Sequence, residues 1–285
     1  LKLRLAHKGW QYQSFIAQQE DFQKVYYDYH RRKHTAVNYL SYNFQNRIEV
    51  GFFEGIIYRS LDTTNYNYNV PLSFFTPLPV LRSLVHRNSN KHYLLTGLSV
   101  KLQILKYAII YGQTAFSPAQ GGNAFQAGIK MPDVLPKQLS GHSLFLQAEY
   151  NTAKNRLFAH PDNAFQSWSH YNREAAHPAG TNFSETVLRA HYSYNRLGIT
   201  IKRTDLNQEL NRGQIFLTNS EINFANSTEK TKITYLNFQA AYTINPAWQL
   251  QITVGTEIRK TPEQSDQFMF FGLQSALHNF QTDYI

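Results

Sequence analysis

The sequence predicts an all-β protein, a transmembrane antiparallel β-barrel of the outer-membrane type with about twelve strands. Three observations support this prediction. Apolar and polar residues alternate over stretches of about ten residues, which suits membrane-spanning strands. Short and long connections alternate along the chain, as they do when turns lie on one side of a membrane and loops on the other. No apolar run reaches the roughly 18 residues that a transmembrane helix needs.

The clearest pair of strands is "YLNFQAAYTINPAWQLQITVGTEI", residues 235–258. On both sides of Asn245-Pro246, apolar residues such as Phe238 and Ile252 alternate with polar ones. Asn-Pro favours a tight turn, because proline fixes φ and asparagine can bond its own backbone. We therefore expect a hairpin whose apolar face contacts lipid and whose polar face lines the lumen.

The same alternation predicts the other strands. In chain order, the expected strands are 1–5, 36–44, 47–52, 97–104, 107–111, 123–131, 144–151, 188–194, 197–201, 236–244, 248–258 and 268–280. Short turns are expected at 45–46, 105–106, 195–196 and 245–247. Longer loops are expected at 17–34, 59–93, 117–122, 152–184, 206–231 and 260–267, with 132–141 intermediate in length.

We treat residues 1–285 as a single barrel domain, either a whole barrel or the C-terminal part of a larger one. Because the chain begins at Leu1 without a methionine, we expect that it is processed or incomplete. The alternative fold is a soluble sandwich or lipocalin-like protein with the apolar face inside. Soluble strands usually have about 5–6 residues, fewer than the best strands here.

The composition excludes several classes of function. With no cysteine, the chain has no disulfide scaffold, no thiolate metal site and no cysteine nucleophile. The net charge of +9 comes from scattered residues. No stretch resembles a nucleic-acid-binding module, so we expect no nucleic-acid partner.

One block of sequence resembles a known family. Within residues 145–185 the resemblance rests on "EYN" (149–151), "HYN" (170–172) and "AHPAGTNFSE" (176–185), which contains His177, Pro178, Gly180, Asn182 and Glu185. Shorter stretches elsewhere also fit, among them "NYLSYNF" (38–44), "VGFFEGIIYR" (50–59) and "FFTPLPVLRS" (74–83). The chain thus resembles the RemB-like gliding-motility barrels of Bacteroidota, which are grouped with Wzi-like capsule-assembly barrels.

The resemblance implies a non-enzymatic protein of the cell outer membrane, without a cofactor, in contact with outer-membrane lipid and lipopolysaccharide. It implies an accessory or scaffold role in gliding motility or type 9 secretion, with protein partners from a surface or secretion complex. It equally implies a role in surface polysaccharide attachment. The sequence alone does not separate these roles.

The long loops supply candidate interaction residues. Aromatic rings there lie among Asn, Thr and His, a combination that suits a glycan or a protein partner, since rings contact sugar C–H faces and also serve protein interfaces. The candidates are Tyr66, Tyr68, His160, Trp168, His170, Tyr171, Asn172 and His177. An ordered plug on the barrel is the structural alternative for the same residues.

Charged residues are also expected in the lumen, and the candidates are Glu54, Lys101, Glu149 and Arg259. By strict alternation Glu54 would face lipid, so either a β-bulge at "GFFEG" turns it inward, toward a cation such as Lys101, or it lies at the outer rim. The glycines on both sides favour the bulge. Inner cations also suggest the alternative function, a narrow anion-preferring porin.

We expect neither a metal site nor an enzyme. The histidines 160, 170 and 177 have spacings that do not match zinc ligand pairs. In "GHS" (141–143) and "WSH" (168–170) serine and histidine are adjacent, and neighbours on a strand point to opposite faces, which argues against a catalytic dyad.

Overall fold

The computed structural model describes residues 1–23, 29–59, 74, 92–118, 121–136, 138–160, 166–209 and 230–275. Its strands are β1 (Lys2–His7), β2 (Trp10–Gln23), β3 (Tyr29–Phe44), β4 (Ile48–Arg59), β5 (His92–Leu105), β6 (Ala108–Phe116), β7 (Asn123–Met131), β8 (His142–Lys154), β9 (Ser169–His170), β10 (Arg173–Glu174), β11 (Phe183–Tyr194), β12 (Leu197–Glu209), β13 (Lys230–Asn245), β14 (Leu250–Lys260) and β15 (Ser265–Gln274). Among the described residues, no helix is long and apolar enough to cross a membrane.

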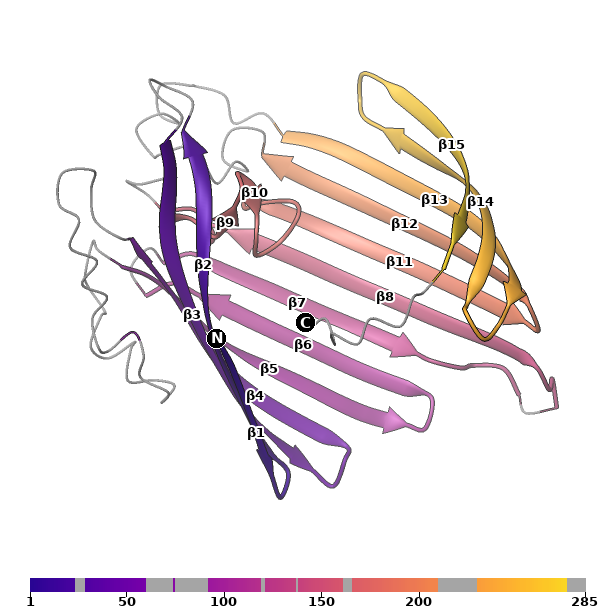
Figure 1. Cartoon of the computed structure of the whole chain (residues 1–285), viewed down its shortest axis with the longest axis horizontal. Coiled ribbons are helices and arrows are strands. Elements are labelled where there is room, and N and C mark those ends of the chain that lie inside the picture. Colours follow the sequence, from indigo (N-terminus) through magenta and orange to yellow (C-terminus); the bar gives the residue numbers. More distant parts are fainter. Residues whose placement is uncertain are drawn as a thin grey trace.

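Thirteen of these strands form one antiparallel sheet in which neighbours in sequence are neighbours in space, except that β8 pairs with β11. The intervening β9 and β10 form a separate two-stranded ribbon. Figure 1 shows the large sheet as a curved wall, from β1 in indigo to β15 in yellow. The predicted all-β, antiparallel, meandering architecture is confirmed.

The prediction of a long loop is wrong at two places. Most of 17–34 is strand, because β2 runs to Gln23 and β3 begins at Tyr29. Polar residues Ser14 and Gln18 interrupt the apolar face of β2, and that hides its alternation. The second loop, 260–267, is a turn of only 261–264 between β14 and β15.

The sheet has one apolar and one polar face, as the alternation predicts. Residues that pair directly across an antiparallel ladder share a face, and the registers join Phe238 to Ile201 and Val254 to Phe271. These side chains are exposed, Phe271 at 74%. An exposed apolar face of this kind suits contact with lipid. We call it the outward face, and the opposite face the inner face.

The turns follow the expected chemistry. The side-chain Oδ1 of Asn245 accepts hydrogen bonds from the backbone N–H groups of Ala247 (2.9 Å) and Trp248 (3.4 Å). Gln45 and Asn46 both have positive φ, 50° and 56°, in the turn between β3 and β4. Two consecutive residues with positive φ give the backbone twist that matches a tight hairpin.

On the inner face, aromatic rings lie over glycines of the neighbouring strand. In each case the space of a glycine Cβ is taken by ring atoms. The pairs are Tyr39 over Gly51, Phe53 over Gly97, Tyr111 over Gly128 and Phe270 over Gly255. Such pairs fill the gap that a glycine leaves in a sheet and help to fix its register.

Glu54 is the clearest error of the sequence prediction. Strand β4 pairs with β3 and β5 without a register shift, so no bulge turns Glu54 inward, and it stays on the outward face between Asn38 and Thr96. Its side chain is fully buried. Further along this face, Ile56 belongs to a buried cluster that includes Phe74. The part of this face around Ile56, on strands β2 to β5, is therefore covered by protein rather than lipid.

Strands β1 and β15 are the edges of the sheet, and no ladder joins them among the described residues. Backbone groups along an edge lack partners in the sheet, and in lipid such groups are costly. In a membrane these edges therefore have to be paired, either with each other or with further strands.

Candidate functional site: the inward segment and its pocket

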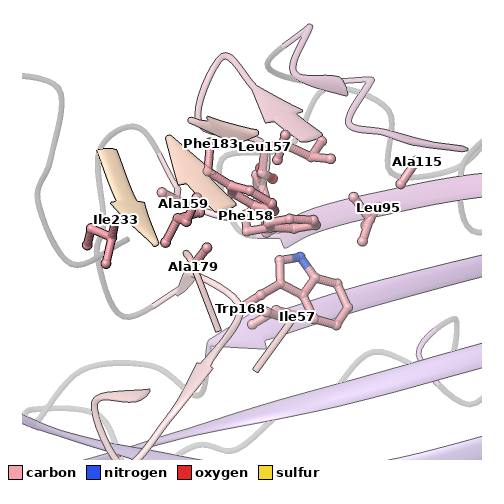
Figure 2. Close-up of a cluster of buried hydrophobic side chains, with 13 residues drawn as sticks. Ile57, Leu95, Ala115, Leu157, Phe158, Ala159, Trp168, Ala179, Phe183 and Ile233 are labelled. Carbon is pink, nitrogen blue, oxygen red and sulfur yellow. The ribbon is translucent and has the colours of Figure 1, made fainter. Parts of the chain in front are cut away.

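The connection between β8 and β11 folds onto the inner face. We call its described residues, 155–160 and 166–182, the inward segment. Leu157, Phe158 and Trp168 of this segment pack in one buried cluster with wall residues. The wall residues are Ile57, Tyr93, Leu95, Ala115, Ala153, Phe183, Leu206 and Ile233, all on the inner face of strands from β4 to β13. Figure 2 shows Phe158 and Trp168 in the middle of this cluster.

A buried ion pair fixes the inward segment to the opposite part of the wall. Lys33 Nζ on β3 lies 2.6 Å from Asp21 Oδ2 on β2, and both side chains are almost fully buried. The same ammonium donates to the carbonyl of Ser167 (2.7 Å) and to Ser169 Oγ (2.7 Å). Ser169 Oγ donates in turn to Asp21 Oδ2 (2.5 Å). We call Asp21, Lys33, Ser167 and Ser169 the latch.

The ribbon β9–β10 extends this attachment. Tyr171 and Asn172 form its turn with positive φ values of 50° and 54°. Their backbone N–H groups donate to Glu20 O (2.6 Å) and to Asp21 Oδ1 (2.9 Å), and Glu20 N donates to His170 Nδ1 (3.2 Å). Because the inward segment thus reaches from β2 to β13, it has to lie across the concave side of the sheet, where Figure 1 draws β9 and β10.

Trp168 sits directly on the wall. A Cβ added at Gly55 of β4 would lie 2.5 Å from Trp168 Cη2. The indole therefore needs a glycine beneath it. Backbone bonds fix the residue from both sides, since Trp168 N donates to Phe158 O and Ala175 N donates to Trp168 O, each at 2.9 Å.

We expect Gly55→Ala to displace Trp168, because the new methyl would overlap a ring that backbone bonds hold in place. Overpacking of this kind costs about 1–3 kcal/mol. The emission of Trp168, recorded in a Trp10→Phe, Trp248→Phe background, should shift to the red. The matched control is Gly198→Ala, also on the inner face, where the nearest atom is His191 Cε1 at 3.4 Å. An equal emission wavelength in both variants would contradict the packing of Trp168 on Gly55.

A hydrogen-bond network covers the wall beside the segment. The amide Nδ2 of Asn151 donates to both Glu149 Oε1 and Glu185 Oε2, each at 2.9 Å. Tyr111 donates to Glu149. His177 Nε2 of the inward segment lies 3.2 Å from Glu185 Oε2, and its ring stacks on Phe183 with centroids 4.3 Å apart. The network joins β6, β8, β11 and the segment.

Much of this network comes from the block that carries the family resemblance. Asn182 has φ of 53°, and its Oδ1 accepts from the backbone N–H of Arg156 (2.8 Å). Gly180 also has positive φ, 71°, where glycine costs little. The stretches 149–151 and 176–185 thus build the base of the inward segment and its tie to the wall.

Between the inward segment and the wall lies a pocket of about 300 Å³. Rings of Phe53 and Trp168 line it together with the polar side chains of Gln113, Gln126, Asn151 and His177. This combination can bind a ligand that has both C–H faces and hydroxyl groups. The aromatic rings would pack against the C–H faces, and the amides would form hydrogen bonds with the hydroxyls.

The structure distributes the predicted loop residues over several settings. Tyr66 and Tyr68 lie outside the described residues. His160 and Trp168 are buried, and His170 and His177 are bonded within the inward segment or to the wall. Among the candidates that the structure describes, Tyr171 and Asn172 are the exposed ones. The described part of this connection is therefore ordered against the inner face of the sheet.

Of the predicted lumen charges, Lys101, Glu149 and Arg259 are on the inner face, whereas Glu54 is not. Within the described parts of the chain, no three His, Asp or Glu side chains are grouped as a metal site would need.

The latch was not predicted from the sequence. Asp21 and Lys33 were assigned to a loop at 17–34, although Glu20-Asp21 and Arg32-Lys33 carry opposite charges. In an antiparallel hairpin such runs face each other, so a β2–β3 hairpin could have been inferred from them. Gln113 and Gln126 carry no comparable signal, since many other inner-face positions of the strands are polar as well.

Comparisons with known proteins support the fold. No family model and no curated protein matches the sequence. A solved structure of Wzi from Escherichia coli, described as an outer membrane protein involved in group 1 capsule assembly and as a carbohydrate-binding β-barrel, matches with a TM-score of 0.60 and 11% identity. The match covers 91% of this chain and 53% of the Wzi chain, so the chain spans about half of that protein.

Two proteins of Pseudomonas aeruginosa match over more of their length. OccK10 matches with a TM-score of 0.51 and 10% identity over 98% of this chain and 72% of its own. OprD matches with a TM-score of 0.50 and 8% identity, over 97% and 69%. The chain therefore has the fold of outer-membrane β-barrels, which supports a location in the cell outer membrane.

Proposed function

We propose that the chain is a non-enzymatic outer-membrane barrel that binds surface polysaccharide inside its lumen and thereby helps to hold it at the cell surface. The observation that carries this proposal is the pocket between the inward segment and the wall, where aromatic and amide side chains meet. The structural similarity to a carbohydrate-binding barrel, Wzi, supports the same proposal.

The non-enzymatic part of the proposal rests on how the serine and histidine of "WSH" are used. Ser169 Oγ is bonded to Lys33 and Asp21 in the latch. His170 Nδ1 accepts from the backbone of Glu20. A nucleophile has to reach its substrate, whereas the Ser169 side chain is fully buried in the latch. Both groups therefore serve to attach the inward segment.

Two other roles remain predictions. The scaffold role in gliding motility or type 9 secretion rests on the family resemblance alone. The narrow anion-preferring porin rests on inner-face cations such as Lys101 and Arg259. The inward segment argues against an open porin, because it lies across the concave side of the wall.

In planar bilayers we expect the purified protein to give no steady open-channel steps, because the latch keeps the inward segment in the lumen. Single-channel recording at several salt concentrations measures this directly. Steady steps with an anion-selective reversal potential would favour the porin instead.

The proposed function is tested by purifying the protein from outer membranes in mild detergent, followed by sugar analysis and mass spectrometry. We expect polysaccharide to come with the barrel, and to be absent when the host lacks that polysaccharide. Stoichiometric motility or secretion proteins without sugar would instead support the scaffold role and contradict the glycan-binding role.

A further inference from the structure

The pocket offers two aromatic surfaces. The ring of Phe53 lies over Gly97 of the neighbouring strand, so one side of the ring is against the wall while the residue also lines the pocket. Trp168 lies over Gly55 and lines the same pocket from the inward segment. Rings supported in this way are rigid, so a ligand that contacts them orders few side chains on binding.

The polar groups of the pocket suit hydroxyl ligands. The indole Nε1 of Trp168 is buried and has no hydrogen-bond acceptor among the described residues, although the side chain is only 8% exposed. An unsatisfied buried N–H is costly and is rare in native structures. The amides of Gln113 and Gln126 line the same pocket. The two glutamine amides provide the donors and acceptors that a ligand hydroxyl needs in the pocket, while Trp168 contributes its ring.

The charge around the pocket disfavours an acidic ligand. Both donors of the Asn151 amide point at carboxylates, those of Glu149 and Glu185. Asn151 therefore presents its Oδ1, an acceptor, to other partners. The carboxylates of Glu149 and Glu185, both bonded to Asn151 of the pocket lining, repel a third carboxylate through an interior that screens charge weakly. A hydroxyl group can donate to an amide oxygen, whereas a carboxylate cannot.

We propose that this pocket binds one uncharged pyranose unit of the polysaccharide, with its C–H face against Phe53 or Trp168 and its hydroxyls bonded to Gln113, Gln126 and Asn151. This inference rests on the proposed function and adds the position of the sugar and its lack of charge. The pocket volume of about 300 Å³ accommodates a single hexose rather than a chain of them.

The test uses an array of gluco-, galacto- and manno-configured oligosaccharides, each printed beside a counterpart of equal length built from the corresponding uronic acid. The purified whole barrel carries Trp10→Phe and Trp248→Phe, so that emission reports on Trp168 alone. The best neutral and acidic pair is then titrated in solution.

Gln113→Leu removes one pocket amide, and Gln251→Leu, on the inner face of β14, is the matched control.

We expect the neutral member to bind about tenfold or more tightly than its acidic counterpart and to change the emission of Trp168. Gln113→Leu should weaken binding about five- to tenfold, the effect of one lost hydrogen bond, while Gln251→Leu should leave it unchanged.

Three outcomes would overturn the proposal. If the uronic-acid members bind as well or better, the neutral assignment is wrong and the glycan-binding function stands. If neutral members bind without changing Trp168 emission and without loss in Gln113→Leu, the site is elsewhere and the function again stands. If no member binds, both the site and the function are wrong.

Discussion

Lys33→Met will detach the inward segment from β2 and β3. The substitution leaves the carboxylate of Asp21 buried without its counter-ion, at 1% side-chain exposure. Breaking a buried pair by removing one partner costs about 3–5 kcal/mol. It also removes the bonds from the ammonium to Ser167 and Ser169. Hydrogen exchange should become about a hundredfold faster or more at the backbone amides of Tyr171 and Asn172.

Two controls separate the latch from a general effect of charge. Arg32→Ala breaks the neighbouring pair of Arg32 with Glu20 on the outward face, where the arginine side chain is 55% exposed. Exposed pairs contribute about 0–1 kcal/mol, so exchange should hardly change. Adding Asp21→Asn to Lys33→Met should recover part of the loss, because no unpaired charge stays buried. Equal exchange in Lys33→Met and Arg32→Ala would contradict the latch.

Phe238→Arg will impair insertion and stability of the barrel. Phe238 lies near the middle of β13 on the outward face, with Ile201 opposite it on β12. An arginine on the lipid face near the bilayer midplane costs about 2–4 kcal/mol. Urea unfolding from lipid vesicles should show a loss of this size, together with lower yield in the outer membrane.

The control for this prediction is Gln239→Arg, one residue further along the same strand. Gln239 faces inward, opposite Thr200 and Gly255, where an arginine stays in contact with water. Its stability should therefore change little. A larger loss in Gln239→Arg than in Phe238→Arg would mean that the apolar face is the interior and would favour the soluble sandwich.

The sequence predicted the faces of the sheet because period-two alternation reports directly on the side that a residue takes. This worked for Phe238 and Ile252, whose outward positions follow from parity alone. It failed on β2, where Ser14 and Gln18 occupy outward positions. Polar residues at these outward positions remove the alternation, so parity alone did not reveal the strand.

Glu54 shows the same limit of prediction from period-two alternation. Parity correctly assigned it to the outward face, and the cost of a charge in lipid then argued for a bulge. Burial of that part of the outward face was not visible from the sequence, because it depends on contacts such as those of Ile56 with Phe74. Local pattern fixes which face a residue takes, while tertiary contacts decide what covers that face.

The candidate site was only partly predictable for a related reason. The sequence identified Trp168, His170 and His177 as residues of interest in a long loop, and left open whether that loop binds a partner or forms a plug. Their position on the inner face depends on the latch and on contacts between residues more than a hundred positions apart, as between Lys33 and Ser169. Periodicity carries no information about such contacts.

Fluorescence quenching by brominated lipids tests the central claim most directly, namely that the apolar face contacts lipid while the inward segment lies in the lumen. Two single-tryptophan proteins are compared in vesicles whose lipids are brominated near the headgroup end of the acyl chains. One keeps only Trp10, which is 51% exposed on the outward face, and the other keeps only Trp168, which is 8% exposed. We expect strong quenching of Trp10 and little of Trp168. Quenching of Trp168 as strong as that of Trp10, or none of Trp10, would contradict this arrangement.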